Sequence, residues 1–350
     1  MQQNSSQFHL PPSKDHAALF IFGDSLFDAG NNNYINTTTA LQANFQPYGE
    51  TFFHHPTGRF SDGRLISDFI AEYAKLPFPP PYKQPGDHQF SCGVNFASAG
   101  AGALSETNSG MVIDLKMQQE NFKGVKKMLE KNLGEEEAKM FLSRAVYLFS
   151  IGGNDYATPF LTNSTSIFQI YSKEEYVGMV IGNLTTAIKE IYKLGGRKFG
   201  FVGLGPLGCY PIIRALYPGE CLEELTTLVK LHNNALLKVL KTLAWRLQGF
   251  KYSNFDLYTS VSERINDPSQ YGFKEGESAC CGSGPYRGLN SCGGKRGIEQ
   301  YELCNKPSQY VFFDFAHATE MAHSQLAKIF WAGTPDVVKP VNLKALFEQV

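Results

Sequence analysis

Short apolar runs, separated by longer amphipathic stretches, organise this chain. The first run, residues 17–22, is continuously hydrophobic and is followed by Gly23, which is typical of a buried strand in a parallel sheet. Similar runs predict further strands at residues 93–97, 145–151, 198–204 and 250–255, and a short extended segment at 310–313.

Helical spacing fills the stretches between these runs. Leu65, Phe69 and Tyr73 recur every four residues ahead of Pro77, and another helical stretch stops at the glycine pair 195–196. The pattern predicts helices at residues 65–73, 112–132, 174–194, 221–247 and 318–331. Alternating strands and helices without an internal repeat predict an α/β fold, a doubly wound parallel sheet covered on both faces. Residues 17–350 are expected to form a single domain, after a flexible leader over residues 1–16.

Polar or glycine-rich loops follow several of the predicted strands. In open parallel sheets, ligands bind beyond the carboxyl ends of the strands. The loops that meet there supply a hydroxyl, backbone N–H groups, a carboxamide, a carboxylate and an imidazole, and they comprise residues 23–26, 98–102, 152–155 and 314–317. These are the groups that acyl transfer through a serine requires.

Within these loops, Ser25 is the candidate nucleophile. Asp314 precedes His317 by three residues, so its carboxylate can accept the Nδ1–H of the imidazole and leave Nε2 to take the Ser25 proton. A helix starting behind Ser25 would favour developing negative charge. Taken singly, the three residues have simpler explanations as an N-cap serine, a turn-forming aspartate and a capping histidine.

The oxyanion formed by nucleophilic attack needs hydrogen-bond donors. The candidates are the backbone N–H of Ser25, the backbone N–H of Gly100 and the side-chain amide of Asn154. Glycine at position 100 permits close approach of a ligand, although glycine and asparagine are also common turn residues.

Composition and charge narrow the function. The formal net charge of −1 provides no basic field for nucleic acid or for anionic membranes. No apolar stretch is long enough for a transmembrane helix, and residues 1–16 lack the apolar core of a signal peptide. Aromatic residues make up 13% of the chain; they either fill the core or form an apolar substrate surface, for which the loops 45–60 and 78–90 are candidates.

Cysteine usage favours an exported protein. Four of the seven cysteines fall between residues 280 and 304, in a glycine-rich segment that disulfides would order. A zinc site is the alternative, but the cluster contains no C-x-x-C pair, and the eight histidines lack paired ligand spacing. No G-x-G-x-x-G follows a strand, so neither a metal nor a cofactor is expected. Sequons at Asn4, Asn36, Asn163 and Asn183 also suit export.

Five blocks of sequence resemble the plant GDSL esterase/lipases, which belong to the SGNH hydrolases. They are FGDSLFDAGNNN at 22–33, PTGRFSDGR at 56–64, NFASAGAG at 95–102, IGGND at 151–155 and D-x-x-H at 314–317. The resemblance spans nearly the whole chain. It implies a flavodoxin-like three-layer α/β/α sandwich around a five-stranded parallel sheet, without metal or cofactor. It also implies that the chain is secreted and glycosylated, its signal peptide already removed.

The same resemblance assigns roles to the candidate residues. Ser25 would be the nucleophile and an oxyanion donor, with Gly100 and Asn154 completing the oxyanion hole and His317 and Asp314 completing the triad. Two positions depart from the family pattern, Ala318 where proline is common and Ala99 where glycine is common. Neither change removes a catalytic group, so they affect the expected substrate preference.

The family also suggests how the cysteines are used. Cys209 and Cys221 look like one local bridge, and two more bridges would join Cys280, Cys281, Cys292 and Cys304, for which three pairings are possible. Cys92 would then remain as a buried free thiol.

Three functions fit these observations. The first is hydrolysis of small apolar esters. The second is transfer of the acyl group from a donor such as an acyl-CoA to a hydrophobic alcohol, as in plant family members that form pyrethrin-type esters. The third is a non-catalytic binding or defence role, which an intact triad argues against. The sequence does not predict an oligomeric state.

Overall fold

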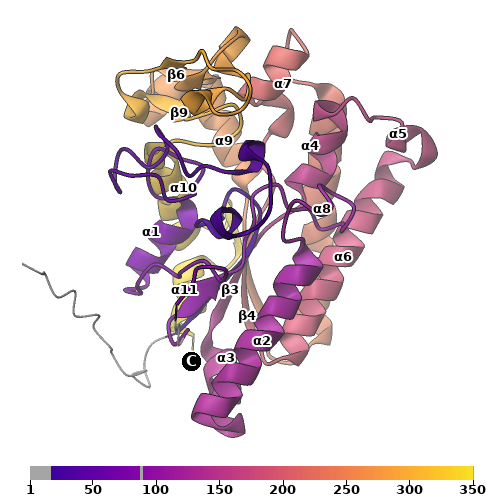
Figure 1. Ribbon diagram of the computed structural model, residues 1–350. Coiled ribbons are helices and arrows are strands. Elements are labelled where there is room, and N and C mark those ends of the chain that lie inside the picture. The colour runs from indigo at the N-terminus through magenta and orange to yellow at the C-terminus, as the bar shows by residue number, and fades with distance from the viewer. Residues whose placement is uncertain (1–16, 87–89, 350) are drawn as a thin grey trace, which may run out of the picture.

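The computed structural model describes residues 17–86 and 90–349 (Figure 1). The expected leader, residues 1–16, and the sequon at Asn4 lie outside these residues. Within them, no helix is long and apolar enough to cross a membrane.

A six-stranded sheet forms the centre of the molecule, with strand order β10-β5-β4-β3-β1-β2. The strands are β1 (Leu19–Gly23), β2 (Gly93–Asn95), β3 (Val146–Ser150), β4 (Lys198–Val202), β5 (Lys251–Phe255) and β10 (Val338–Pro340). The first five run parallel, in the flavodoxin-like order 2-1-3-4-5. The expected α/β fold is therefore confirmed.

The edge strand β10 was not predicted. It pairs antiparallel with β5, so that Val338 lies opposite Phe255. Three residues that end in proline give no periodic signal, and proline is tolerated in a sheet only at such an edge.

Helices cover both faces of the sheet (Figure 1). One face carries α2 (Leu115–Leu133), α6 (Lys173–Lys193) and α8 (Glu223–Arg246), and the other carries α1 (Ile66–Tyr73), α9 (Leu257–Asn266), α10 (Glu320–Ala332) and α11 (Leu343–Glu348). Strand side chains alternate between the two cores: Phe20 and Phe22 face the first layer, and Leu19 and Ile21 face the second. Much of the aromatic content therefore fills the core.

Several short helices were missed by the sequence analysis. They are α3 (Glu135–Arg144), α4 (Gly153–Leu161), α5 (Ile167–Ile170) and α7 (Pro211–Leu216), together with α9 and α11 of the second layer. Helix α4 starts directly after β3 at a glycine and contains Pro159, and both residue types weaken a helical pattern. Its position brings the residues after β3 to the edge where Ser25 lies.

The cysteine-rich segment is mostly irregular and lies above the sheet edge. It contains β6 (Glu275–Ala279), β7 (Cys281–Gly282) and β8 (Glu302–Leu303), and β6 pairs with β9 (Tyr310–Phe312).

Disulfides join Cys209 to Cys221, Cys280 to Cys304 and Cys281 to Cys292. Cys92 is a free thiol as expected, but it is half-buried, not buried. Among the described residues, no group of three or more His, Cys, Asp or Glu side chains is placed to hold a metal ion.

Candidate active site

Ser25 lies in a tight turn at the carboxyl end of β1. Gly23 precedes this turn with a φ of +152°, and a Cβ on it would come within 2.2 Å of the Ser150 carbonyl oxygen, so only glycine fits. The Asp24 carbonyl then accepts the N–H groups of Phe27 and Asp28, at 3.1 and 2.9 Å. These bonds close the turn and leave the Ser25 hydroxyl facing the pocket.

No α-helix begins behind Ser25, so no helix N-terminus is available to stabilise negative charge there. The chain instead continues into a short 3-10 helix, Asn31–Tyr34. The Asp28 carboxylate accepts the N–H groups of Gly30 and Asn31, both at 2.7 Å, and this side-chain bonding stabilises a loop in place of a helix. The negative charge that develops on the substrate oxygen beside Ser25 must therefore be stabilised by individual hydrogen-bond donors.

A continuous chain of hydrogen bonds joins the three predicted triad residues. His317 Nε2 lies 2.8 Å from Ser25 Oγ, and His317 Nδ1 lies 2.7 Å from Asp314 Oδ1. Asp314 is fully buried, whereas the His317 side chain is 11% exposed. The spacing of three residues works because Asp314 Oδ1 also accepts the His317 N–H, at 2.9 Å, which holds the turn closed.

Two residues that the sequence analysis missed support the buried carboxylate. Tyr48 donates its hydroxyl to Asp314 Oδ2 at 2.6 Å, and Arg296 donates to the Tyr48 oxygen at 2.8 Å. Burial by itself raises the pKa of Asp314, but the attraction of His317 and Arg296 and the bonds from His317 and Tyr48 bring this pKa below its ordinary value. Asp314 is therefore held as a carboxylate.

Aromatic rings hold Arg296 and the imidazole in place. The Arg296 guanidinium lies over the rings of Phe45, Tyr48 and Phe60, at 4.9, 5.2 and 5.7 Å from their centres. The Phe60 ring also packs on His317, with 4.6 Å between ring centres. The aromatic content of residues 45–60 hinted at this cluster, but nothing in the sequence linked Arg296 to it.

The three residues predicted to supply oxyanion donors, Ser25, Gly100 and Asn154, all line one pocket. Over residues 17–86 and 90–349, the backbone N–H groups of Ser25 and Gly100 have no hydrogen-bond acceptor. Asn154 Nδ2 donates to the Ala101 carbonyl at 2.9 Å, which orients the amide and leaves its second N–H unused. These unpaired donors suit an oxygen that becomes negatively charged only during reaction.

The pocket itself has a volume of about 270 Å³ and follows the carboxyl edge of the sheet. Apolar side chains dominate its walls, and they include Leu26, Leu41, Leu161, Leu204, Leu207, Ile212, Ile213, Leu257, Val261, Val311, Phe312, Phe315 and Leu326. Of the two loops proposed as its aromatic wall, residues 45–60 contribute Phe60, but the described part of residues 78–90 contributes nothing. Phe78 and Tyr82 pack into the two cores instead.

Comparisons with known proteins establish the family of the chain. Residues 19–330 match the family model described as GDSL-like Lipase/Acylhydrolase. The chain belongs to this family. Among curated relatives, GDSL esterase/lipase 2 of Arabidopsis thaliana is 57% identical, over 95% of this chain and 90% of its own length. A GDSL lipase of Tanacetum cinerariifolium is 51% identical, over 96% of this chain and 89% of its own length.

Membership of the GDSL family does not by itself establish turnover. One Arabidopsis relative, 37% identical over 94% of this chain and 74% of its own length, is named an inactive GDSL esterase/lipase-like protein. The geometry around Ser25 is therefore needed to argue for catalysis.

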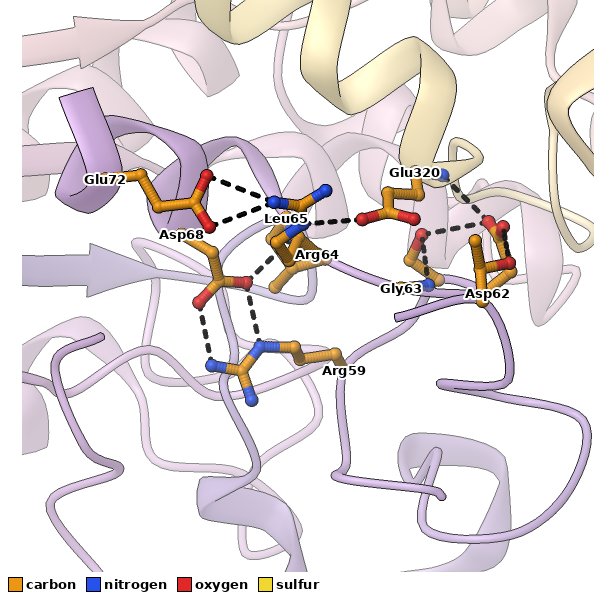
Figure 2. Close-up of polar contacts among 10 residues, drawn as sticks. Arg59, Asp62, Gly63, Arg64, Leu65, Asp68, Glu72 and Glu320 are labelled. Atoms are coloured by element: carbon orange, nitrogen blue, oxygen red, sulfur yellow. Dashed lines mark hydrogen bonds and ion pairs between the residues drawn. The ribbon is translucent and has the colours of Figure 1, made fainter. Parts of the chain in front are cut away.

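The GDSL-family block at 56–64 contacts the residues that follow His317, and Figure 2 shows its bonds to Glu320 and Glu72. Ser61 Oγ donates to the Ala318 carbonyl at 3.1 Å, and Asp62 Oδ1 accepts the Glu320 N–H at 2.8 Å. Arg64 then bridges Glu320 at the start of α10 and Glu72 in α1, at 2.6 and 2.9 Å. These contacts hold the backbone at Ala318 and the start of α10, and so help to position the turn.

A buried ion pair anchors the same block (Figure 2). Arg59 and Asp68 are 7% and 3% exposed, and they form two parallel bonds of 2.7 and 2.8 Å. Arg59→Met is expected to lower the free energy of unfolding by about 3–5 kcal/mol, because Asp68 would remain as an uncompensated buried charge.

Denaturant unfolding followed by circular dichroism measures this loss. Lys123→Met is the matched control, since Lys123 pairs with Glu120 on the surface and should cost less than about 1 kcal/mol. Equal losses for the two variants would contradict the role given to the buried pair.

Proposed function

We propose that this GDSL-family protein hydrolyses carboxylic esters of apolar substrates through an acyl-enzyme formed on Ser25. The observation that carries the proposal is the unbroken chain from Ser25 Oγ through His317 to the buried Asp314 carboxylate. This chain opens into a pocket whose walls are mainly apolar, so an ester with an apolar acyl or alcohol part would bind there by burial of its hydrocarbon surface.

The first half of the reaction forms the acyl-enzyme. His317 Nε2 takes the hydroxyl proton as Ser25 Oγ attacks the ester carbonyl, and the Asp314 carboxylate stabilises the resulting imidazolium. The carbonyl oxygen becomes negatively charged and accepts bonds from the N–H of Ser25, the N–H of Gly100 and the free N–H of Asn154. His317 then protonates the departing alcohol, and the carbon–oxygen bond to that alcohol breaks.

The second half releases the acid. A water molecule takes the place of the alcohol and gives a proton to His317 Nε2 as it attacks the acyl carbon. The same donors stabilise the second oxyanion, and His317 returns the proton to Ser25 as the acid leaves. His317 Nε2 accepts or donates the proton in every transfer of this scheme.

Product analysis tests this proposal. We expect purified protein given an apolar ester to release free acid as the dominant product, including when hydrophobic alcohols are added. Mass spectrometry of the products with and without the alcohols measures the ratio of acid to new ester. A new ester that dominates over free acid would show that the acyl group is transferred to an alcohol, and absence of both products would overturn the proposal.

We also propose that residues 17–350 form one domain and that the protein is exported and glycosylated. The support is the three disulfides and the exposed side chains of Asn36, Asn163 and Asn183. Removal of N-glycans from protein secreted by plant cells should lower its apparent mass, and retention of the protein inside the cells would contradict export.

A further inference from the structure

The pocket beside Ser25 reaches across the sheet edge toward both helical layers. Its outer half is lined by residues of α4 and by the loops around Leu41 and Asn108. Its inner half is lined by Leu257 and Val261 of α9, by Val311, and by Ala322, His323 and Leu326 of α10. Ser25 lines the same pocket as both sets of residues, so an ester held at Ser25 can direct one of its two chains toward each set.

His323 is an unusual residue in the lining of an apolar pocket. It is the fourth residue of α10 and is 1% exposed. Neither ring nitrogen has a hydrogen-bond partner within the described part of the chain. Burial lowers the pKa of His323 to about 3, so the ring is neutral at ordinary pH and offers one donor and one acceptor. Buried polar groups without partners are rare and costly in folded proteins.

A second buried histidine shows that burial alone does not explain this arrangement. His232 is also 1% exposed, and burial lowers its pKa to about 3 as well. Its Nδ1, however, lies 2.9 Å from the Tyr156 hydroxyl, and it does not line the pocket. The core histidine has a partner within the protein, whereas the pocket histidine has none among the described residues.

Arg264 also lines the pocket but already has hydrogen-bond partners. Arg264 donates through Nε to Gln325 at 3.0 Å and through Nη1 to the Ser260 carbonyl at 2.7 Å. Asn290 also lines the pocket, and its Oδ1 likewise has no partner among the described residues, but this oxygen can only accept a hydrogen bond. The neutral His323 ring offers both a donor and an acceptor to a molecule that enters the pocket.

We propose that the inner half of the pocket takes the chain of an ester that is mainly hydrocarbon but carries a hydroxyl or keto group, and that His323 hydrogen-bonds this oxygen. The inference rests on the proposed ester hydrolysis and extends it to substrate selection. A plain alkyl chain fills the compartment but leaves both ring nitrogens unpaired. An oxygenated chain of the same length gives the ring a partner, and a hydroxyl can use either nitrogen as donor or acceptor.

Two series of esters test this proposal. In the first, a single hydroxyl is moved along the acyl chain, and in the second it is moved along the alcohol chain, each with the unsubstituted ester as reference. Release of acid is followed by titration, and the readout is kcat/KM relative to the unsubstituted ester. We expect one position in one series to be preferred about tenfold, the size of one well-placed hydrogen bond, and the responding series identifies the chain that enters the inner half.

Variants assign the preference to the imidazole. His323→Leu should abolish the tenfold ratio, and His323→Asn, which keeps one donor and one acceptor, should retain part of it. His232→Asn is the matched control, because it alters an equally buried histidine outside the pocket and should leave the ratio unchanged even where overall activity changes.

Each outcome is decisive. If no hydroxylated ester is preferred while unsubstituted esters are hydrolysed, the inference is wrong and the proposed function stands. A preference that persists in His323→Leu also overturns it, because another group must then bind the oxygen. If no ester of either series is hydrolysed by the wild-type protein, the proposed function fails first.

Discussion

Ser25→Ala is expected to lower kcat for a simple ester by roughly 10⁴–10⁶-fold, the range found when the nucleophile of a serine triad is removed. His317 and Asp314 would keep their mutual bond, but no atom would remain to form the acyl-enzyme. The unused N–H groups of Ser25 and Gly100 could still bind an ester carbonyl, so a small residual rate above that of water is expected.

The fold should survive this change. Ser25 is half-buried, and its hydroxyl is bonded to His317, so loss of one oxygen should change the free energy of unfolding by about 1 kcal/mol or less. Rates by titration and stability by denaturant unfolding are measured together. Ser143→Ala is the control, because Ser143 lies at the end of α3, away from the pocket, and bonds to the Met140 carbonyl. Activity of Ser25→Ala above a tenth of wild type would overturn the assignment of the nucleophile.

The sequence predicted the sheet and the loops at its carboxyl edge because both depend on local patterns. A continuous apolar run followed by glycine is sufficient to predict β1, and parallel strands bring the loops that follow them to one edge. The same rule placed Ser25 near Asn154, since β1 and β3 are neighbours at the point where the strand order reverses. The relatives then strengthened the functional interpretation.

Long-range partners could not be predicted in this way. Tyr48 and Arg296 lie about 250 residues apart and meet only beneath Asp314, and no periodicity links them. His323 looked like one more residue of a C-terminal helix, because a missing partner is a property of the three-dimensional packing. The local structure after Ser25 also depends on one side chain, because the Asp28 carboxylate competes for the backbone N–H groups that a helix would need.

The disulfide pairing illustrates the same limit and its physical resolution. The loops closed by Cys280–Cys304 and Cys281–Cys292 span 24 and 11 residues, and loop entropy varies too slowly with length to choose among pairings. Neighbouring residues of an extended chain point to opposite sides. Cys280 and Cys281 therefore reach different partners, which becomes evident only once β6 and β7 are in place.

Asp314→Asn is expected to lower kcat/KM by about 10⁴-fold while leaving Ser25 and His317 in place. Both carboxylate oxygens of Asp314 accept bonds: Oδ1 from His317 and the turn backbone, and Oδ2 from Tyr48. An amide must turn an N–H toward one of these donors, and it cannot stabilise the imidazolium. Tyr48→Phe is the graded comparison, because it removes one bond and keeps the charge, and about a tenfold loss is expected.

Stability measured against pH separates this electrostatic role from a packing role. Since the pKa of Asp314 is lower in the folded protein than its ordinary value, the carboxylate stabilises the fold above that ordinary value, near pH 4, and this contribution is lost as the pH falls through the lower folded value. The difference in unfolding free energy between wild type and Asp314→Asn should therefore shrink as the pH is lowered below about 4. A difference that stays constant with pH, together with activity within tenfold of wild type, would show that Asp314 shapes the turn but does not serve the imidazole as a charge.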